Sequence, residues 1–202
     1  MLRSSLVCAQ FYDKLKIRHS ITELLEYLWQ SPTHFHMWRH IAKEEEKCLY
    51  LNFLTFLISD SIYLLDESQN KILELKKIEA EMSNTSEWEQ WPAGKKQERT
   101  RQFHSLEDTI SAAMKLAMED IRMLAFTSEK IAAPFLLPEM VERVANMLNY
   151  FMLKLVGTKR NSLALKHPER YQFQPKELIK QIARIYVHLA RGDRKYISQC
   201  HI

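Results

Sequence analysis

The stretch YLNFLTFLISDSIYLLDESQNKILELKKIEAEMSN, residues 50–84, decides the fold class. Apolar side chains in its first half recur at i, i+3, i+4 and i+7, namely Leu51, Leu54, Leu57, Ile58, Ile62 and Leu65. This recurrence is typical of a helix with one face in a core. The polar run Asp66-Glu67-Ser68 predicts a turn, and the apolar residues after it predict a second helix, namely Ile72, Leu73, Leu75 and Ile78. Such a pair of helices is the unit from which helical scaffolds are built.

The composition of the whole chain also favours helices. Only three of the 202 residues are glycine, whereas β-proteins and phosphate-binding loops need glycine at tight turns. A hydrophobic fraction of 46% with 27% charged residues is that of an ordinary globular protein. The formal charge of +4 implies no nucleic acid partner by itself, because such proteins carry a basic stripe along one face. The basic cluster of the chain also contains Glu98 and predicts a solvated segment rather than a phosphate site; it comprises Lys95, Lys96, Arg99 and Arg101.

The cysteines indicate a reducing compartment. Cys8, Cys48 and Cys200 are odd in number and far apart, and none belongs to a Cys-x-x-Cys pair, so a disulfide framework is not expected. Cys48 could serve as a nucleophile, but a small buried hydrophobic residue is the favoured interpretation.

No segment predicts a membrane partner. The most apolar window, residues 49–65, contains Asn52, Asp60 and three hydroxyl side chains, and it is too short and too polar to span a bilayer. The apolar patch at residues 6–9 is shorter than the core of a signal peptide. We therefore expect a soluble, intracellular protein.

Further helices are predicted before the central stretch. Residues 2–18 predict a weak first helix, and Ser20-Ile21-Thr22-Glu23 is a capping-box pattern that predicts the start of the next. The apolar side of that next helix would consist of Ile21, Leu24, Leu25 and Leu28. Pro32 predicts the start of a third helix, because proline suits a first helical turn. The inward residues of the third helix would be Phe35, Trp38, Ile41 and Ala42.

The second half predicts three more helices around two irregular segments. Residues 84–99 show no helical stripe and predict an exposed connection. A helix is expected over residues 105–126 and another over 138–155, whose stripe is Val141, Val144, Leu148, Phe151 and Leu155, widened by Met140, Met147 and Met152. This methionine-rich stripe predicts core packing, with a partner groove as the alternative. Gly157 occupies the position of a left-handed helix cap. A polar loop over 158–173 precedes a last helix that begins at Pro175 and ends before Gly192, with Leu178, Ile182, Ile185 and Leu189 facing inward.

The residue chemistry predicts no catalytic, cofactor-binding or metal site. His36, His40 and Glu44 share one helix face, but the third position lies about 12 Å from the first by helical rise, so a polar surface is favoured over zinc. Asp60 and Asp66 could be paired carboxylates, but a capping or loop-fastening role of Asp60 is favoured. No cofactor is therefore expected, and the chain is predicted to bind partners rather than to transform them.

Two longer runs carry a family resemblance. FLISDSIYLLDESQNKILELKKIEAEMSNTSEWEQ at residues 56–90 resembles the core region of the chain-elongating ubiquitin conjugation factors, most closely their plant members. The run APFLLPEMVERVANMLNYFMLKLVGTKRNSLALKHPERYQFQPKELI at residues 133–179 resembles the same region, and a weaker likeness extends from about residue 24 to 192. The resemblance implies an all-α, armadillo-like stack of helical hairpins. Together with the periodicity it predicts seven to eight helices and, in a slice of such a stack, an apolar face left open at one end.

The resemblance also implies a function and a domain plan. Members of this family lengthen ubiquitin chains in proteasomal degradation and protein quality control, contact an AAA ATPase segregase of the valosin-containing type and ubiquitinated substrates, and act in the cytoplasm and nucleus. Their ligase activity belongs to a U-box that recruits the conjugating enzyme, and the sequence shows no U-box. We expect a partial core over 1–192, an exposed internal loop over 84–99 and a divergent tail over 193–202 that ends in RKYISQCHI. The alternatives are a helical-repeat adaptor unrelated to ubiquitin and a metal-dependent enzyme that uses His36 and His40.

Overall fold

The computed structural model describes residues 2–43, 47–157, 165 and 168–199, and these are almost entirely helical. The elements in chain order are α1 (Leu2–Leu28), α2 (Pro32–Lys43), α3 (Lys47–Ser83), α4 (Thr85–Gln90), α5 (Ala93–Lys130), the 3-10 helix η1 (Ala133–Leu136), α6 (Pro138–Leu155), the 3-10 helix η3 (Pro168–Tyr171) and α7 (Pro175–Gln199). The described residues contain no strand. The all-α prediction is therefore confirmed, and the arrangement is compatible with an armadillo-like stack.

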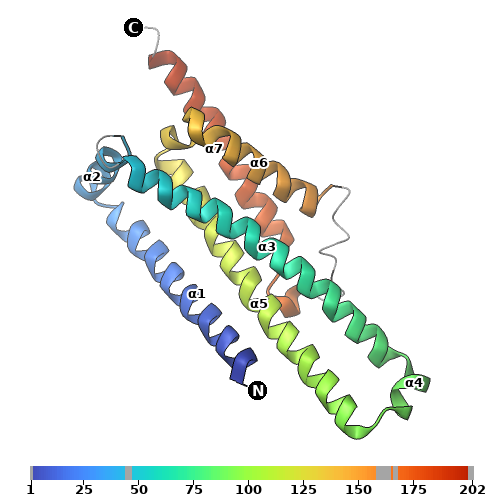
Figure 1. Ribbon diagram of the computed structural model, residues 1–202. Coiled ribbons are helices and arrows are strands. Elements are labelled where there is room, and N and C mark those ends of the chain that lie inside the picture. Colours follow the sequence, from blue (N-terminus) through green and yellow to red (C-terminus); the bar gives the residue numbers. More distant parts are fainter. Residues whose placement is uncertain (1, 44–46, 158–164, 166–167, 200–202) are drawn as a thin grey trace.

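Helix α5 lies at the centre of the molecule. It forms a long hairpin with α3, and the short helix α4 closes the tip of that hairpin (Figure 1). Helix α1 packs on α5 from one side and α7 packs on it from the other, while α6 contacts both α3 and α7. The largest hydrophobic cluster runs through all of these contacts, from Leu25 on α1 to Ile185 on α7. One continuous core therefore joins the helices.

Helix α3 continues through the turn that the sequence predicts at Asp66-Glu67-Ser68, so that prediction is wrong. Ser68 is fully buried, and its hydroxyl donates to the carbonyl of Leu64 at 2.7 Å. A hydroxyl that bonds back to the preceding turn satisfies itself inside a helix. Asp66 and Glu67 contact side chains of α6 and of the next turn of α3, respectively. The polar triplet therefore makes contacts within α3 and with α6, and it does not break the helix.

The predicted start at Ser20-Ile21-Thr22-Glu23 is also wrong, because α1 runs through it as one helix. Thr22 is fully buried and donates to the carbonyl of Arg18 at 3.0 Å, so its hydroxyl caps nothing. Ile21 and Leu24, predicted to face inward, are 41% and 54% exposed. The inward face of α1 contains Leu25 instead, together with Trp29 just past its end. The face of α1 that packs inward is therefore rotated about the helix axis from the predicted apolar face.

Residues 84–99 form helix α4 and the first turns of α5 rather than a loop. No residue of α4 is buried, so the predicted exposure of the segment is correct even though its conformation is not. Pro92 is the N-cap of α5, and its carbonyl accepts hydrogen bonds from the amides of Lys95 and Lys96. The aromatic contact between Trp88 and Trp91 holds the tip together, with ring centroids 5.3 Å apart.

Helix α6 has the predicted bounds, but its stripe differs in one position. Val144, Leu148 and Phe151 are buried, whereas Val141 is 44% exposed. Met140 and Met147 are buried as well, which confirms core packing as their role.

Two glycines near the ends of helices have a different role from the predicted one. No described glycine has a positive φ, so Gly157 is not a left-handed cap. A Cβ on Gly157 would lie 2.8 Å from the carbonyl oxygen of Leu153, which only glycine avoids. Gly192 lies inside α7 rather than past its end, and a Cβ there would lie 2.7 Å from that of Ala132. The second glycine therefore lets α7 approach the segment before η1. Helix α7 continues to Gln199 through most of the predicted tail 193–202. Of the predicted polar loop at 158–173, the residues 158–164 and 166–167 lie outside the described ones.

Helix α3 is, by length and composition alone, apolar enough to cross a membrane, which corrects the statement that its window is too short. Core helices of water-soluble proteins meet the same criterion, and 39% of the apolar window is buried inside this protein. One face of α3 packs on α5, whereas Leu49, Phe56 and Tyr63 on another face are more than half exposed. The expected absence of a membrane partner stays a prediction.

Candidate functional site

The predicted ligand and nucleophile candidates do not converge. His36 and His40 lie on the exposed surface of α2, and Glu44 lies outside the described residues. In the part of the chain that the structure describes, no three side chains of the metal-binding types gather within reach of one ion. Cys48 is exposed, so its favoured interpretation as a buried hydrophobic residue is wrong.

Asp60 and Asp66 are not a carboxylate pair, and neither caps a helix, because both lie inside α3. Asp60 forms an ion pair with Arg18 of α1. Asp66 accepts a hydrogen bond from the hydroxyl of Tyr150 and lies 3.7 Å from the ammonium of Lys154, both on α6. Each carboxylate therefore fastens α3 to a different neighbouring helix.

Arg18 links three helices through a largely buried polar contact. Its Nη1 donates to both carboxylate oxygens of Asp120 on α5, each at 2.8 Å, and Nη2 contacts Asp60 on α3. The side chain of Asp120 is completely inaccessible to solvent, and that of Arg18 is 12% exposed. The guanidinium also stands over the ring of Phe56, 5.5 Å from its centroid. We call Arg18, Asp60 and Asp120 the arginine cluster.

The protonation of Asp120 follows from this burial. Desolvation raises the pKa of Asp120 to about 8; Arg18 opposes the rise and the neighbouring Asp60 adds to it. At neutral pH Asp120 therefore carries a proton and accepts hydrogen bonds from Arg18 as a neutral carboxylic acid. Because the side chain of Asp120 is inaccessible to solvent, a substrate could not reach its carboxyl group, and the group contributes only to contacts between helices.

This shift predicts a pH dependence of stability. The folded-state pKa of Asp120 lies above its unfolded value, so its contribution to stability is complete at pH below about 4 and is lost as the pH rises toward about 8. The side chain in Asp120→Asn has the same shape and stays neutral at every pH. This variant should therefore not show the loss of stability as the pH rises. Urea unfolding across that pH range measures both proteins. We expect the unfolding free energy of wild type to fall relative to that of the variant as pH rises; a constant difference would contradict the assignment.

A second buried polar group joins α3 to α6. The ammonium of Lys154 donates to the side-chain carbonyl of Gln69 and stands 5.3 Å from the ring centroid of Tyr150, although Lys154 is only 8% exposed. Burial and the hydrogen bond to Asp66 raise the pKa of the Tyr150 hydroxyl above its usual value. These groups satisfy one another, as buried polar groups must.

A serine–histidine contact between α5 and α7 has the spacing of a catalytic pair but not its chemistry. Ser128 Oγ lies 3.0 Å from Nδ1 of His188, and the same hydroxyl donates to the carbonyl of Ala125 at 2.9 Å. The serine hydroxyl is thus engaged by Ala125, which is not the arrangement of a nucleophile that donates its proton to a base. Ser128 is 1% exposed, so a substrate could not reach it.

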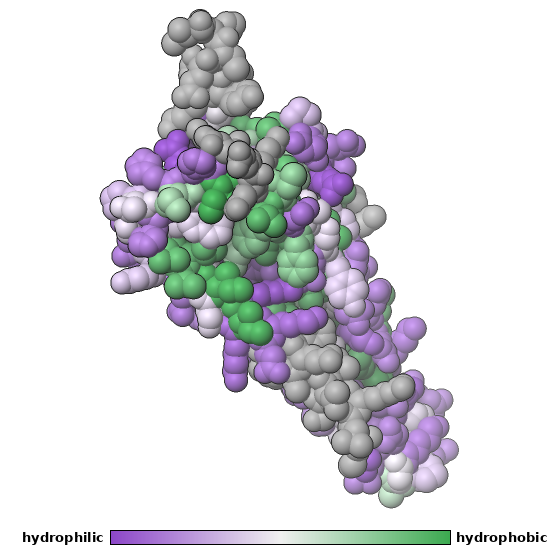
Figure 2. Space-filling model, turned by 60° about the vertical axis from the view of Figure 1, so that its left-hand side comes forward, coloured by the Kyte–Doolittle hydropathy of each residue, from purple (hydrophilic) through white to green (hydrophobic). Residues whose placement is uncertain are grey.

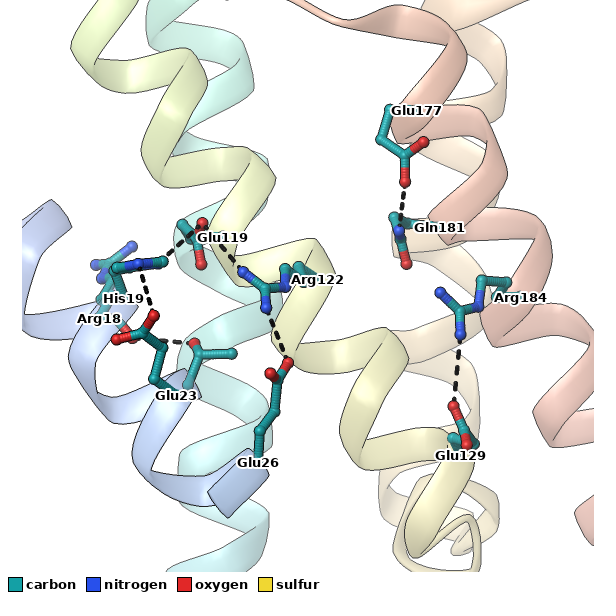
Figure 3. A network of polar contacts seen from close by, with 11 residues as sticks. Arg18, His19, Glu23, Glu26, Glu119, Arg122, Glu129, Glu177, Gln181 and Arg184 are labelled. Carbon is teal, nitrogen blue, oxygen red and sulfur yellow. Dashed lines mark hydrogen bonds and ion pairs between the residues drawn. The ribbon is translucent and has the colours of Figure 1, made fainter.

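Partly exposed ion pairs fix the flanking helices on α5, as Figure 3 shows. On the α1 side, Arg122 pairs with Glu26 at 2.9 Å, and His19 lies 3.6 Å from Glu119. On the α7 side, Arg184 pairs with Glu129 at 3.6 Å. Pairs of this exposure each add at most about 1 kcal/mol, so they set the register of the helices more than the stability.

A cleft of about 410 Å³ opens between α1, α5 and the segment after η3. It is lined by Lys16, His19, Lys115, Met118, Glu119, Gln172 and Gln174. Gln172 has a φ of 55°, an unusual conformation for a residue with a side chain. The ionisable groups in the cleft are Lys16, Lys115, His19 and Glu119, and the histidine lies 3.6 Å from the glutamate.

The predicted basic cluster at the hairpin tip is not an anion site. Lys95 stands over the ring of Trp91 at 3.4 Å, and Lys96 donates to the backbone carbonyl of Glu89. Arg99 forms a two-point contact with Glu81, and Arg101 pairs with the neighbouring Glu98. The cations are thus engaged locally, in agreement with a solvated segment.

Apolar side chains remain exposed on several helices. Figure 2 shows them gathered over the upper half of one face, while hydrophilic residues cover the far end of the hairpin. The large hydrophobic residues more than half exposed are Ile17, Leu24, Tyr27, Met37, Leu49, Phe56 and Tyr63, all on α1, α2 and α3. Surfaces of this kind mark contacts with other polypeptides.

Of the polar residues that the sequence indicated, Asp60 and Asp66 contact neighbouring helices, and the arginine cluster as a whole was missed. Arg18 and Asp120 are 102 positions apart, so no local pattern connects them. Only the burial of Asp120 could have been predicted from the sequence, because Asp120 lies on the same helix face as the apolar residues Ala113, Ala117 and Leu124.

Comparisons with known proteins give a consistent result. The sequence model described as ubiquitin elongating factor core matches residues 7–199. A "Probable ubiquitin conjugation factor E4" of Arabidopsis thaliana is 71% identical over 184 residues, which are 91% of this chain and 18% of that protein. The "E4 ubiquitin-protein ligase UFD2" of Saccharomyces cerevisiae is 29% identical over 94% of this chain and 20% of its own length. The "Ubiquitin conjugation factor E4" of Schizosaccharomyces pombe is 31% identical over 89% of this chain. The chain spans about a fifth of the length of these relatives.

Proposed function

Because this chain belongs to the ubiquitin elongating factor core family, we propose that it is a helical scaffold for the elongation of ubiquitin chains on tagged proteins. In this role it holds partners in place, and the ligase chemistry belongs to a U-box outside the family core. The assignment rests on the family match over residues 7–199, which covers almost all of the chain.

The use of the polar side chains supports a scaffold. The buried ionisable groups Asp120 and Lys154 each satisfy a partner on another helix. Such contacts position helices relative to one another. Several large apolar side chains on α1, α2 and α3 are exposed, which favours binding.

The partners follow from the family. We propose ubiquitin-tagged proteins as the general class of partner and an AAA ATPase segregase of the valosin-containing type as a specific partner. A protein in this role would act in the cytoplasm and nucleus, where proteasomal degradation and quality control take place. A helical-repeat adaptor unrelated to ubiquitin is not favoured, because the family match leaves it no supporting observation.

A pull-down tests the proposed partners. The immobilised chain should enrich the segregase, polyubiquitinated proteins or both from a plant extract, and an equally charged helical protein of unrelated fold serves as the control. Repeating the experiment with purified segregase and purified ubiquitin chains shows whether either contact is direct. Enrichment of neither, relative to the control, would count against the proposal.

A reconstituted conjugation reaction tests whether the ligase activity lies outside this chain. With activating enzyme, conjugating enzyme, ubiquitin and a tagged substrate, the chain alone should give no chain growth above background, because the ligase chemistry of the family belongs to a U-box outside this core. Gel analysis of chain length over time measures this directly. Chain growth that depends on this protein alone would show that it is a ligase in its own right.

A further inference from the structure

The cleft between α1, α5 and the segment that joins η3 to α7 has the size of a ligand site. Its volume is about 410 Å³. Ligand pockets in proteins commonly measure about 300–1,000 Å³. The cleft is therefore large enough for a small ligand or for a short stretch of peptide, and three separate elements contribute its walls.

Two walls of the cleft carry lysines that lack an anionic partner. Neither Lys16 of α1 nor Lys115 of α5 forms an ion pair with a carboxylate of the residues that the structure describes. Glu119 lies one turn after Lys115, a spacing at which such pairs commonly form. It contacts His19 at 3.6 Å and Arg122 at 3.8 Å instead (Figure 3). Ammonium groups that line a cleft without a counter-charge create a positive potential that attracts an anion.

The third wall presents two carboxamides on a strained backbone. Along residues 171–174 the side chains alternate, so that Tyr171 and Phe173 are buried whereas Gln172 and Gln174 line the cleft. Gln172 has a φ of 55°, in the left-handed region that costs free energy for a residue with a side chain. Strain of this kind is concentrated at binding and catalytic positions, where the surrounding structure enforces it.

Contacts around Gln172 enforce that conformation. Glu107 of α5 pairs with Arg170 at 2.9 Å and lies 3.4 Å from the hydroxyl of Tyr171. The amide of Gln172 donates to the carbonyl of Glu169 at 3.1 Å. The backbone that carries the two carboxamides is therefore fixed before a ligand arrives, which lowers the entropy lost on binding.

The polar groups of the cleft match a peptide with acidic side chains. Lysine ammonium groups bind carboxylates, and each glutamine carboxamide offers an acceptor and two N–H groups, which complement a peptide backbone. Met118 adds an adaptable apolar surface. The described lining residues include no aromatic ring on which a base could stack, which disfavours a nucleic acid. We infer that this cleft binds an extended segment of another protein that carries aspartate or glutamate side chains.

Titration with two blocked peptides of opposite charge tests the site. One peptide alternates glutamate with alanine, and the other alternates lysine with alanine. In NMR spectra of the chain, the glutamate peptide at concentrations up to about 1 mM should shift the signals of the Met118 methyl group and of the Gln172 and Gln174 carboxamides. The lysine peptide should leave these signals in place. Added salt should weaken the binding of the glutamate peptide, because it screens partly exposed charges.

Charge substitutions identify the residues that hold the peptide. Lys16→Glu and Lys115→Glu should each weaken the affinity for the glutamate peptide at least about fivefold, because each replaces an attractive charge by a repulsive one. Lys180→Glu is the matched control, at a lysine on α7 whose side chain is 66% exposed and which does not line the cleft. It should leave the affinity unchanged.

Gln172→Gly separates a role in binding from a role in the fold. Glycine adopts a φ of 55° without strain, so the melting temperature should not fall. The affinity for the glutamate peptide should fall at least about threefold, because one carboxamide is lost. A lower melting temperature with an unchanged affinity would assign the conformation of Gln172 to the fold alone and overturn the inference.

Three further results would overturn the inference. Inorganic phosphate might bind as tightly as the glutamate peptide while the carboxamide signals stay in place, which would reveal an adventitious anion site only. The lysine peptide could shift the same signals, or neither peptide could shift them although the circular dichroism spectrum is that of the folded chain. None of these results depends on the segregase or ubiquitin pull-down, so the two proposals can fail separately.

Discussion

Replacing Val144 by aspartate is expected to unfold much of the protein. Val144 is 2% exposed on the inward face of α6, among Met140, Met147 and Leu148. A carboxylate there would lose its hydration and find no cation, because the nearest buried ammonium, that of Lys154, lies almost three helical turns away and is engaged with Gln69. We expect a loss of about 4 kcal/mol or more, a large fraction of the stability of a typical domain.

The neighbouring Val141 supplies the control. It lies on the same helix one turn earlier and is 44% exposed, so Val141→Asp keeps its charge in water. Its position in the second turn of α6, near the amino end of the helix, also suits a negative charge. Thermal unfolding followed by circular dichroism should show a decrease in Tm of roughly 10 °C or more for Val144→Asp and little change for Val141→Asp. Equal effects of the two substitutions would mean that the face of α6 is wrongly assigned.

Arg18→Met should have the second largest effect. The substitution removes the two hydrogen bonds that Arg18 donates to Asp120 and the ion pair of Arg18 with Asp60. Removing one partner of a buried polar contact of this kind costs about 3 kcal/mol or more, because the groups left behind are desolvated without a partner. Helix α1 should loosen from α5 first, since it loses its central polar contact with the rest of the molecule.

A rescue variant separates the effect of the lost polar contacts on stability from the effect of changed packing. Asp60→Asn and Asp120→Asn added to Arg18→Met replace the two carboxyl groups that have lost their partner while preserving the size of the side chains. We expect this triple variant to recover at least half of the lost unfolding free energy, as measured by urea denaturation. Arg122→Met, which removes a partly exposed cation from the same α1–α5 interface, should cost no more than about 1 kcal/mol. A triple variant no more stable than Arg18→Met would show that the cluster acts through packing alone.

The apolar periodicity predicted most of the helices, and α6 shows why. Its stripe is bounded by Pro138, which suits a first helical turn, and by Gly157, so both ends are marked in the sequence. The predicted breaks inside α1 and α3 were wrong for one shared reason. Serine, threonine and aspartate are typical of turns, yet Thr22 and Ser68 bond to their own helix and Asp66 bonds to α6.

The candidate site was less accessible to prediction than the fold. The arginine cluster joins positions in three helices, and its formation depends on how α1 packs against the α3–α5 hairpin. The exposure of Cys48 and of Ile21 depends equally on which neighbour each helix face has. A single sequence gives the stripe of a helix but not the helix that covers it.

The family match and the structure describe different aspects of this region. The match assigns the chain to the ubiquitin elongating factor core, and the structure shows helices joined by one continuous hydrophobic core. The large hydrophobic side chains that are more than half exposed lie on α1, α2 and α3.

Exchange of the matched region tests the scaffold role most directly. The corresponding region of the Arabidopsis relative, 71% identical, is replaced by this chain, and ubiquitin chain growth is measured in a reconstituted reaction. We expect the chimera to elongate chains at a rate close to that of its parent, the same chimera with Val144→Asp to be inactive, and this chain alone to be inactive. A folded chimera without activity, or elongation by the isolated chain, would contradict the account.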